Sequence, residues 1–190
     1  MIGQQQKNQA EKWFKDLRDK ICKEFEILEE DHLKLAPKSD MAAKKFERKS
    51  TIRETDDKED GGGGVMATLK GGRIFEKVGV NVSAVYGNLA PEAQKSITAR
   101  KAIPELKDDP RFWASGISLV AHMRNPHTPA IHLNTRMFWT PHAWWFGGGT
   151  DLNPSIENDD DTNFFHQTLK KKCDKHNQSY YKKFKEWADE

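Results

Sequence analysis

The sequence predicts an α+β fold, in which an antiparallel sheet is preceded and followed by helices. An amphipathic helical pattern opens the chain over residues 10–30, and period-two segments rich in Val, Ile and Phe fill its middle. Helical spacing returns near the end, and no strand-like segment alternates regularly with a crossover helix. The length of 190 residues fits a single domain over residues 1–190.

The first helix is expected because large apolar residues recur at helical spacing. They are Trp13, Phe14, Leu17, Ile21, Phe25 and Leu28. Residues 37–64 are charged and poor in large apolar side chains, so we expect a mobile loop region with at most one short strand. The glycines at 61–64 lack the Gly-Lys-Ser/Thr ending of a nucleotide loop, which favours a flexible turn over a phosphate cradle.

Strand-like patterns begin at Val65. Residues 65–69 and 73–86 predict a hairpin over the turn at Gly71 and Gly72. After a proline-containing loop, strands are expected at residues 116–123, 130–139 and 143–147. Helices are expected at residues 158–173 and 178–188.

Composition excludes several classes of protein. The net charge of +2 comes from 31 basic and 29 acidic residues that are interleaved, which argues against nucleic acid as a partner. No apolar run approaches the roughly 20 residues that span a bilayer, and the N-terminus lacks a secretory signal, so a cytoplasmic location is expected. The two cysteines, Cys22 and Cys173, lie too far apart to suggest a disulfide framework or a Cys-rich metal motif.

Polar residues typical of recognition and catalysis alternate along residues 118–136. A symmetric loop centred on His127 would place His122 opposite His132, and Ser118 opposite Arg136. Alternation then puts one set of polar side chains on a single face of the hairpin. The set is Ser118, His122, His132, Asn134 and Arg136. Imidazole can transfer protons near neutral pH and guanidinium pairs with carboxylates, although an ordinary half-exposed sheet also has a polar face.

A second informative segment is WWFGGGTDLNP at residues 144–154. Three consecutive glycines let a large flat ligand approach the main chain, and Asp151 would face that space. An Asx turn or helix cap is the alternative role for Asp151, and the aromatic cluster is more typical of a core.

These segments resemble the oxygen-dependent coproporphyrinogen III oxidase family. The matching text comprises FEKVGVNVS at residues 75–83, the 118–136 stretch, residues 144–154 and the 180–187 helix. Asn153 stands where the family usually has Thr, and the loop after Arg136 is short. Family members extend past Glu190, so we expect this chain to be the N-terminal two-thirds of the family domain and to lack its C-terminal part.

The resemblance implies a large antiparallel sheet with helices on both faces and oxidative decarboxylation of coproporphyrinogen III to protoporphyrinogen IX. Dioxygen is the implied oxidant, with no organic cofactor, and a homodimer is implied by analogy. His132 resembles the proton donor, and Asp151 the carboxylate that faces the pyrrole N–H groups. The substrate-binding residues implied are Ser118, Asn134, Thr135 and Arg136. His122, His132 and His166 resemble suggested divalent-metal ligands, with a fourth expected beyond Glu190.

Two other function classes stay open at this point. One is a His-based metalloenzyme of other specificity, although no His-Glu-x-x-His arrangement is present. The other is a tetrapyrrole-binding protein without catalysis, which needs recognition residues but no proton donor.

Overall fold

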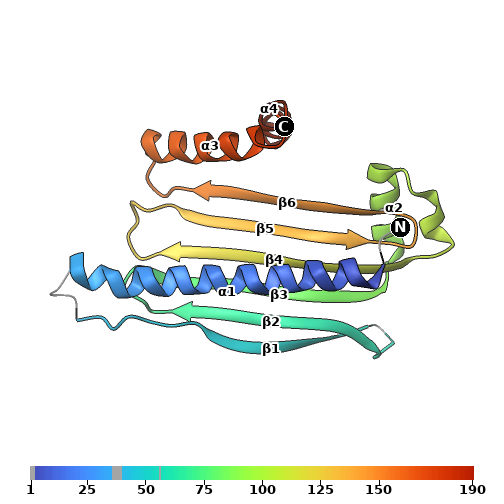
Figure 1. Ribbon diagram of the computed structural model, residues 1–190, viewed down its shortest axis with the longest axis horizontal. Helices are drawn as coiled ribbons and strands as arrows, with labels where there is room; N and C mark the ends of the chain where they lie inside the picture. The colour runs from blue at the N-terminus through green and yellow to red at the C-terminus, as the bar shows by residue number, and fades with distance from the viewer. Residues whose placement is uncertain (1–2, 36–39, 56) are drawn as a thin grey trace.

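The computed structural model describes residues 3–35, 40–55 and 57–190. Six strands form one sheet in the order of the sequence, and every neighbouring pair is antiparallel (Figure 1). The strands are β1 (Glu47–Glu54), β2 (Asp60–Lys70), β3 (Phe75–Asn88), β4 (Arg111–Met123), β5 (Ala130–Trp139) and β6 (Trp144–Asn153). The helices are α1 (Gln4–Leu35), α2 (Pro91–Lys101), a 3-10 turn η1 (Pro104–Lys107), α3 (Asp159–Asp174) and α4 (Tyr180–Asp189). The predicted α+β class and antiparallel sheet are confirmed.

The long helix α1 lies across β3 and β4 (Figure 1). Its 32 residues extend roughly 48 Å, which matches the roughly 46 Å of the 14-residue strand β3. The apolar stripe of α1 buries Phe14 and Cys22 against alternate residues of β2 to β5. These alternate residues are Ala67, Leu69, Val78, Val80, Val82, Trp113, Ile117, Leu119, Ala121 and Met137. Because strand side chains alternate, the opposite face of the sheet carries the intervening residues.

Glu29 joins α1 to the β2–β3 turn from a completely buried position. Its carboxylate accepts hydrogen bonds from the backbone N–H groups of Arg73 (2.7 Å), Ile74 (2.9 Å) and Phe75 (3.0 Å). A Cβ at Gly72 would lie 2.4 Å from the Glu29 carboxylate, so only glycine fits in that turn.

The region over residues 37–64, expected to be a loop with at most one short strand, contains one whole strand and the start of a second, and residues 36–39 and 56 lie outside the described part. Residues 47–54 form the charged, exposed edge strand β1, and the glycines at 61–64 lie inside β2. A Cβ at Gly63 would lie 2.2 Å from the Thr51 carbonyl oxygen, and one at Gly64 2.3 Å from that of Val82. The glycine run therefore lets β2 approach both neighbouring strands closely, instead of forming a turn.

The proline-rich loop expected after β3 contains the helix α2 and the turn η1. Pro91 and Pro104 each stand at the start of a helical segment, where the missing N–H of proline has no intrahelical role. Near the other edge of the sheet, α3 and α4 contact each other beyond β6 (Figure 1). None of the helices in the described ranges combines the length and the apolar character needed to cross a membrane.

Candidate active site

The β4–β5 hairpin places the predicted polar residues on the sheet face opposite α1. Val120 pairs with His132, Ser118 with Asn134, and Gly116 with Arg136. The expected pairing of His122 with His132 is therefore wrong by two residues. The hairpin closes through a turn in which Thr128 N–H donates to the Asn125 carbonyl, so the hairpin is not centred on His127. A shift of two residues preserves the face of every side chain, and the predicted polar face is retained.

His132 and Asp151 form a close pair on this face. They are direct cross-strand partners on β5 and β6, and His132 Nδ1 lies 2.7 Å from Asp151 Oδ1. A carboxylate at this distance favours the neutral tautomer with the proton on Nδ1, which leaves Nε2 as the unprotonated ring nitrogen. The His122 ring is edge-on to His132, with 6.1 Å between centroids. The side chains of His132 and Asp151 are 38% and 57% exposed, which leaves both accessible to a ligand.

Beside this pair, the same face carries Arg136 next to glycines that have no side chain to cover the backbone. Gly149 pairs with Asn134, and Gly147 pairs with Arg136. A Cβ at either glycine would meet nothing within 4 Å. Arg136 is exposed, and within the described residues its guanidinium has no ion-pair partner. A flat anionic molecule could therefore rest on the glycines with a carboxylate at Arg136.

Thr135, predicted to bind substrate with its neighbours, lies on the wrong face. It pairs with Ile117 on β4 and Gly148 on β6, so alternation points it to the α1 side, away from Asn134 and Arg136. Consecutive residues of a strand cannot share a face. Thr135 therefore does not share the site of its two neighbours in this structure.

The three histidines implied as metal ligands do not form one cluster. His166 lies on α3, where its Nδ1 is 3.0 Å from the Tyr181 hydroxyl of α4. The described ranges contain no group of three or more His, Cys, Asp or Glu side chains placed to hold a metal ion. The predicted ligand set of His122, His132 and His166 consequently does not fit a shared metal site in this arrangement.

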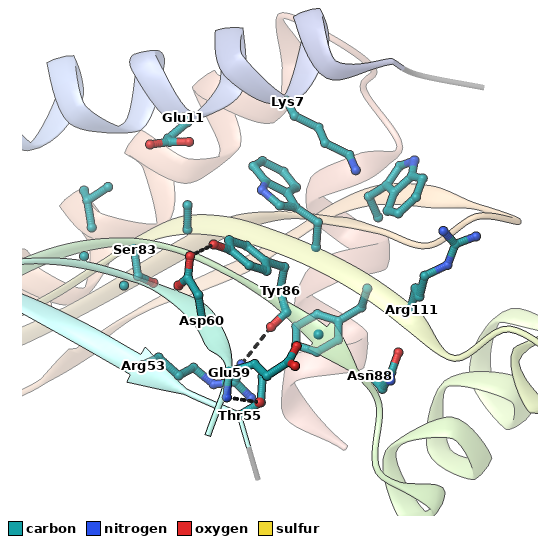
Figure 2. Close-up of a pocket in the computed structure, with 18 of the residues that line it drawn as sticks. Lys7, Glu11, Arg53, Thr55, Glu59, Asp60, Ser83, Tyr86, Asn88 and Arg111 are labelled. Atoms are coloured by element: carbon teal, nitrogen blue, oxygen red, sulfur yellow. Dashed lines mark hydrogen bonds between the residues drawn. The ribbon is translucent and has the colours of Figure 1, made fainter. Parts of the chain in front are cut away.

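A separate cavity of about 990 Å³ lies between the first half of α1 and strands β1 to β5 (Figure 2). Lys7 points from α1 into this cavity, with Nζ 3.2 Å from the ring centroid of Trp139. Desolvation by burial, followed by the positive charge of Arg111, lowers the pKa of Lys7. On the cavity wall, the Tyr86 hydroxyl donates to Asp60, which lowers the pKa of Asp60 and raises that of Tyr86.

The cavity is not the predicted site. Its lining contains none of the residues expected to bind substrate or transfer protons. Carboxylates and cations are mixed along its walls, as Glu11, Asp60, Arg53 and Arg111 illustrate in Figure 2. These mixed charges do not favour a ligand of either sign. The sheet face opposite α1, in contrast, carries the exposed Arg136 together with the His132–Asp151 pair.

Sequence reasoning missed one member of the polar face, Asn153. Its Nδ2 donates to Asp151 Oδ1 at 2.6 Å and lies 3.2 Å from His132 Nδ1. The signal was present in the alternation, since residues 151 and 153 of one strand share a face. It was overlooked because the predicted strand ended at residue 147, whereas β6 continues to Asn153.

Comparison with known proteins assigns the chain to a family. The family model described as Coproporphyrinogen III oxidase matches residues 9–190. The chain belongs to the coproporphyrinogen III oxidase family. It is 46% identical over 178 residues to the oxygen-dependent coproporphyrinogen-III oxidase of Rickettsia peacockii (strain Rustic). It is 44% identical over 178 residues to the protein of the same name from Rickettsia bellii (strain RML369-C).

Both comparisons cover 94% of this chain and 58% of the relative. The chain therefore spans a little over half the length of these coproporphyrinogen oxidases. All the polar residues of the β4–β6 face lie inside the part that matches the family. Lys7 of the α1 cavity lies before that part.

Proposed function

We propose that the chain carries the substrate face of an enzyme that converts two propionates of coproporphyrinogen III into vinyl groups, yielding protoporphyrinogen IX for haem biosynthesis. Each propionate would lose carbon dioxide and two hydrogen atoms. Dioxygen would accept the two hydrogen atoms and leave as hydrogen peroxide. No organic cofactor is needed for this balance. The names of the Rickettsia relatives support both the substrate and the oxidant.

The observation that carries the proposal is the single face on which Arg136, the bare backbone of Gly147 and Gly149, and the His132–Asp151 pair lie together. A tetrapyrrole is broad and carries carboxylates at its rim, so it needs a flat floor and at least one guanidinium. Arg136 would bind a propionate, and Asn134 and Ser118 would complete its hydrogen bonds.

The acid–base pair would serve the chemistry at the ring. Asp151 would accept hydrogen bonds from pyrrole N–H groups and favour an electron-rich ring that reacts with dioxygen. His132 would transfer a proton through Nε2, because Nδ1 is held by Asp151. Both roles are possible at one place because the two residues pair directly across β5 and β6.

The direct test is turnover. This chain, and a version extended to the length of the relatives, are incubated with reduced coproporphyrinogen III in air, and protoporphyrin fluorescence is measured after oxidation. Formation of protoporphyrin by the extended version supports the proposal. Absence of product from an extended version that is folded and binds the substrate would refute it.

A valine at position 149 should block the substrate without harming the fold. A Cβ there enters open space, whereas at Gly148 it would lie 2.3 Å from the Asn134 carbonyl oxygen. We expect Gly149→Val to raise the Michaelis constant of the extended enzyme roughly 10- to 100-fold, because a misfitted flat ligand loses roughly 1–3 kcal/mol. The melting temperature should stay at the wild-type value, while Gly148→Val should lower it. An unchanged Michaelis constant for Gly149→Val would show that the substrate lies elsewhere.

Replacing Arg136 with lysine should weaken substrate binding. The planar guanidinium can bind a carboxylate through two parallel hydrogen bonds, and the ammonium of lysine cannot. The expected rise in the Michaelis constant is roughly tenfold, equivalent to about 1.4 kcal/mol. Steady-state kinetics of Arg136→Lys are compared with Arg100→Lys, an exposed position on α2 that should behave as wild type. Identical kinetics in the two variants would remove Arg136 from the site.

The remaining family features are part of the same proposal. We infer a single domain, a homodimer and a cytoplasmic location from the family resemblance, and sedimentation analysis of the extended version tests the dimer. The divalent metal stays a prediction, and none of the steps above depends on it. Metal analysis and activity after chelation test it: activity that survives complete metal removal would exclude a catalytic metal.

A further inference from the structure

Asn153 is the last residue of β6 and lies beside the His132–Asp151 pair. Its side-chain Nδ2 is 2.6 Å from Asp151 Oδ1 and 3.2 Å from His132 Nδ1. The amide nitrogen must face Asp151, because the amide oxygen in its place would repel the carboxylate. Asn153 therefore donates to the same oxygen that His132 approaches.

Two N–H groups consequently converge on one carboxylate oxygen. Within the described residues, Asp151 has these two side-chain partners and no other. The Asp151 side chain is 57% exposed, so among the described residues these two hydrogen bonds are the polar contacts that restrain its carboxylate. The hydrogen bond from Asn153 would hold Oδ1 where it accepts from His132 Nδ1 and keep the proton of the neutral imidazole on that nitrogen.

We propose that Asn153 is a positioning residue that holds Asp151 and thereby sets the tautomer of His132, leaving Nε2 free to face the substrate. The inference rests on the proposed function for its catalytic consequence, but its structural part concerns only these three side chains.

The test measures the tautomer directly. The ¹⁵N chemical shifts of the His132 ring nitrogens, recorded at mildly alkaline pH, report which nitrogen carries the proton. Asn153→Ala is expected to lower the Nδ1-protonated fraction, whereas Asn153→Thr should retain more of it because a donor remains. A residue that merely supports the end of β6 would change stability and not the tautomer. An unchanged tautomer in Asn153→Ala would overturn the inference.

Kinetics of the extended version supply the second readout. Asn153→Ala should lower kcat roughly tenfold while the Michaelis constant stays within roughly twofold, because the amide orients the acid–base pair and does not hold the substrate. Asn153→Thr should recover part of kcat. Equal kcat in wild type and Asn153→Ala would overturn the inference while leaving the proposed function intact. A tautomer shift without protoporphyrin formation by the wild type would uphold the positioning role and refute the proposed function.

Discussion

Replacing Glu29 with alanine is expected to lower the free energy of unfolding by roughly 3–5 kcal/mol, the cost of removing one partner from a buried, hydrogen-bonded charge. The carboxylate is completely buried and accepts hydrogen bonds from the backbone N–H groups of Arg73, Ile74 and Phe75. The backbone N–H of Lys44 donates to it over a longer distance of 3.4 Å. Alanine would leave these donors without an acceptor. The docking of α1 on the β2–β3 turn would weaken as well.

The measurement is urea unfolding followed by circular dichroism. Glu30→Ala is the matched control, because Glu30 is the next residue of α1, is exposed, and has one long contact of 3.8 Å to Lys45. It should change stability by less than roughly 1 kcal/mol. Glu29→Gln keeps one acceptor oxygen and should fall between the two, which preserves the test if Glu29→Ala does not fold. Equal stabilities of Glu29→Gln and Glu30→Ala would show that the carboxylate is not a stabilising contact.

Replacing His132 with alanine is expected to lower turnover of the extended enzyme by roughly 10²–10⁴-fold, the usual contribution of a positioned acid or base. Substrate binding should be largely retained, because the expected carboxylate contact is Arg136 on the same face. The two quantities are measured separately, as protoporphyrin formation in air and as binding of the substrate under anaerobic conditions.

His127→Ala is the control for this loss. His127 is exposed in the β4–β5 turn of the same hairpin, and its side chain contributes nothing to the polar face. It should retain wild-type turnover and binding. Parallel loss of turnover and binding in His132→Ala would instead assign His132 to substrate recognition, which is the behaviour of a tetrapyrrole-binding protein without catalysis.

The register of the hairpin shows where prediction from local pattern succeeded and where it failed. Both the predicted and the observed pairings of β4 with β5 keep Ser118, His132 and Arg136 on one face, because they differ by an even number of residues. The pairing itself depends on the turn. Asn125 and Thr128 close that turn by a backbone hydrogen bond, and the sequence pattern alone did not locate its centre.

The two glycine runs, at residues 61–64 and 147–149, do not adopt the turns that glycine usually favours. Both lie inside strands, β2 and β6, although glycine is usually depleted there. In β2 the reason is the close approach of two neighbouring backbones. In β6, Gly148 likewise lies close to the backbone of β5, whereas Gly147 and Gly149 leave the polar face bare. Neither reason is contained in the residues of the run, since both depend on how the neighbouring strands pair with it.

The sequence by itself determined the class of fold, the division of side chains between the two faces, and the family, because these follow from local periodicity and from residue types at fixed spacing. Only the tertiary structure decided that Asp151 pairs with His132, that Asn153 joins them, and that Glu29 is buried against a turn distant in sequence. The physical reason is that each of these contacts joins segments through strand register or helix docking, and both are set by the balance of interactions over the whole sheet.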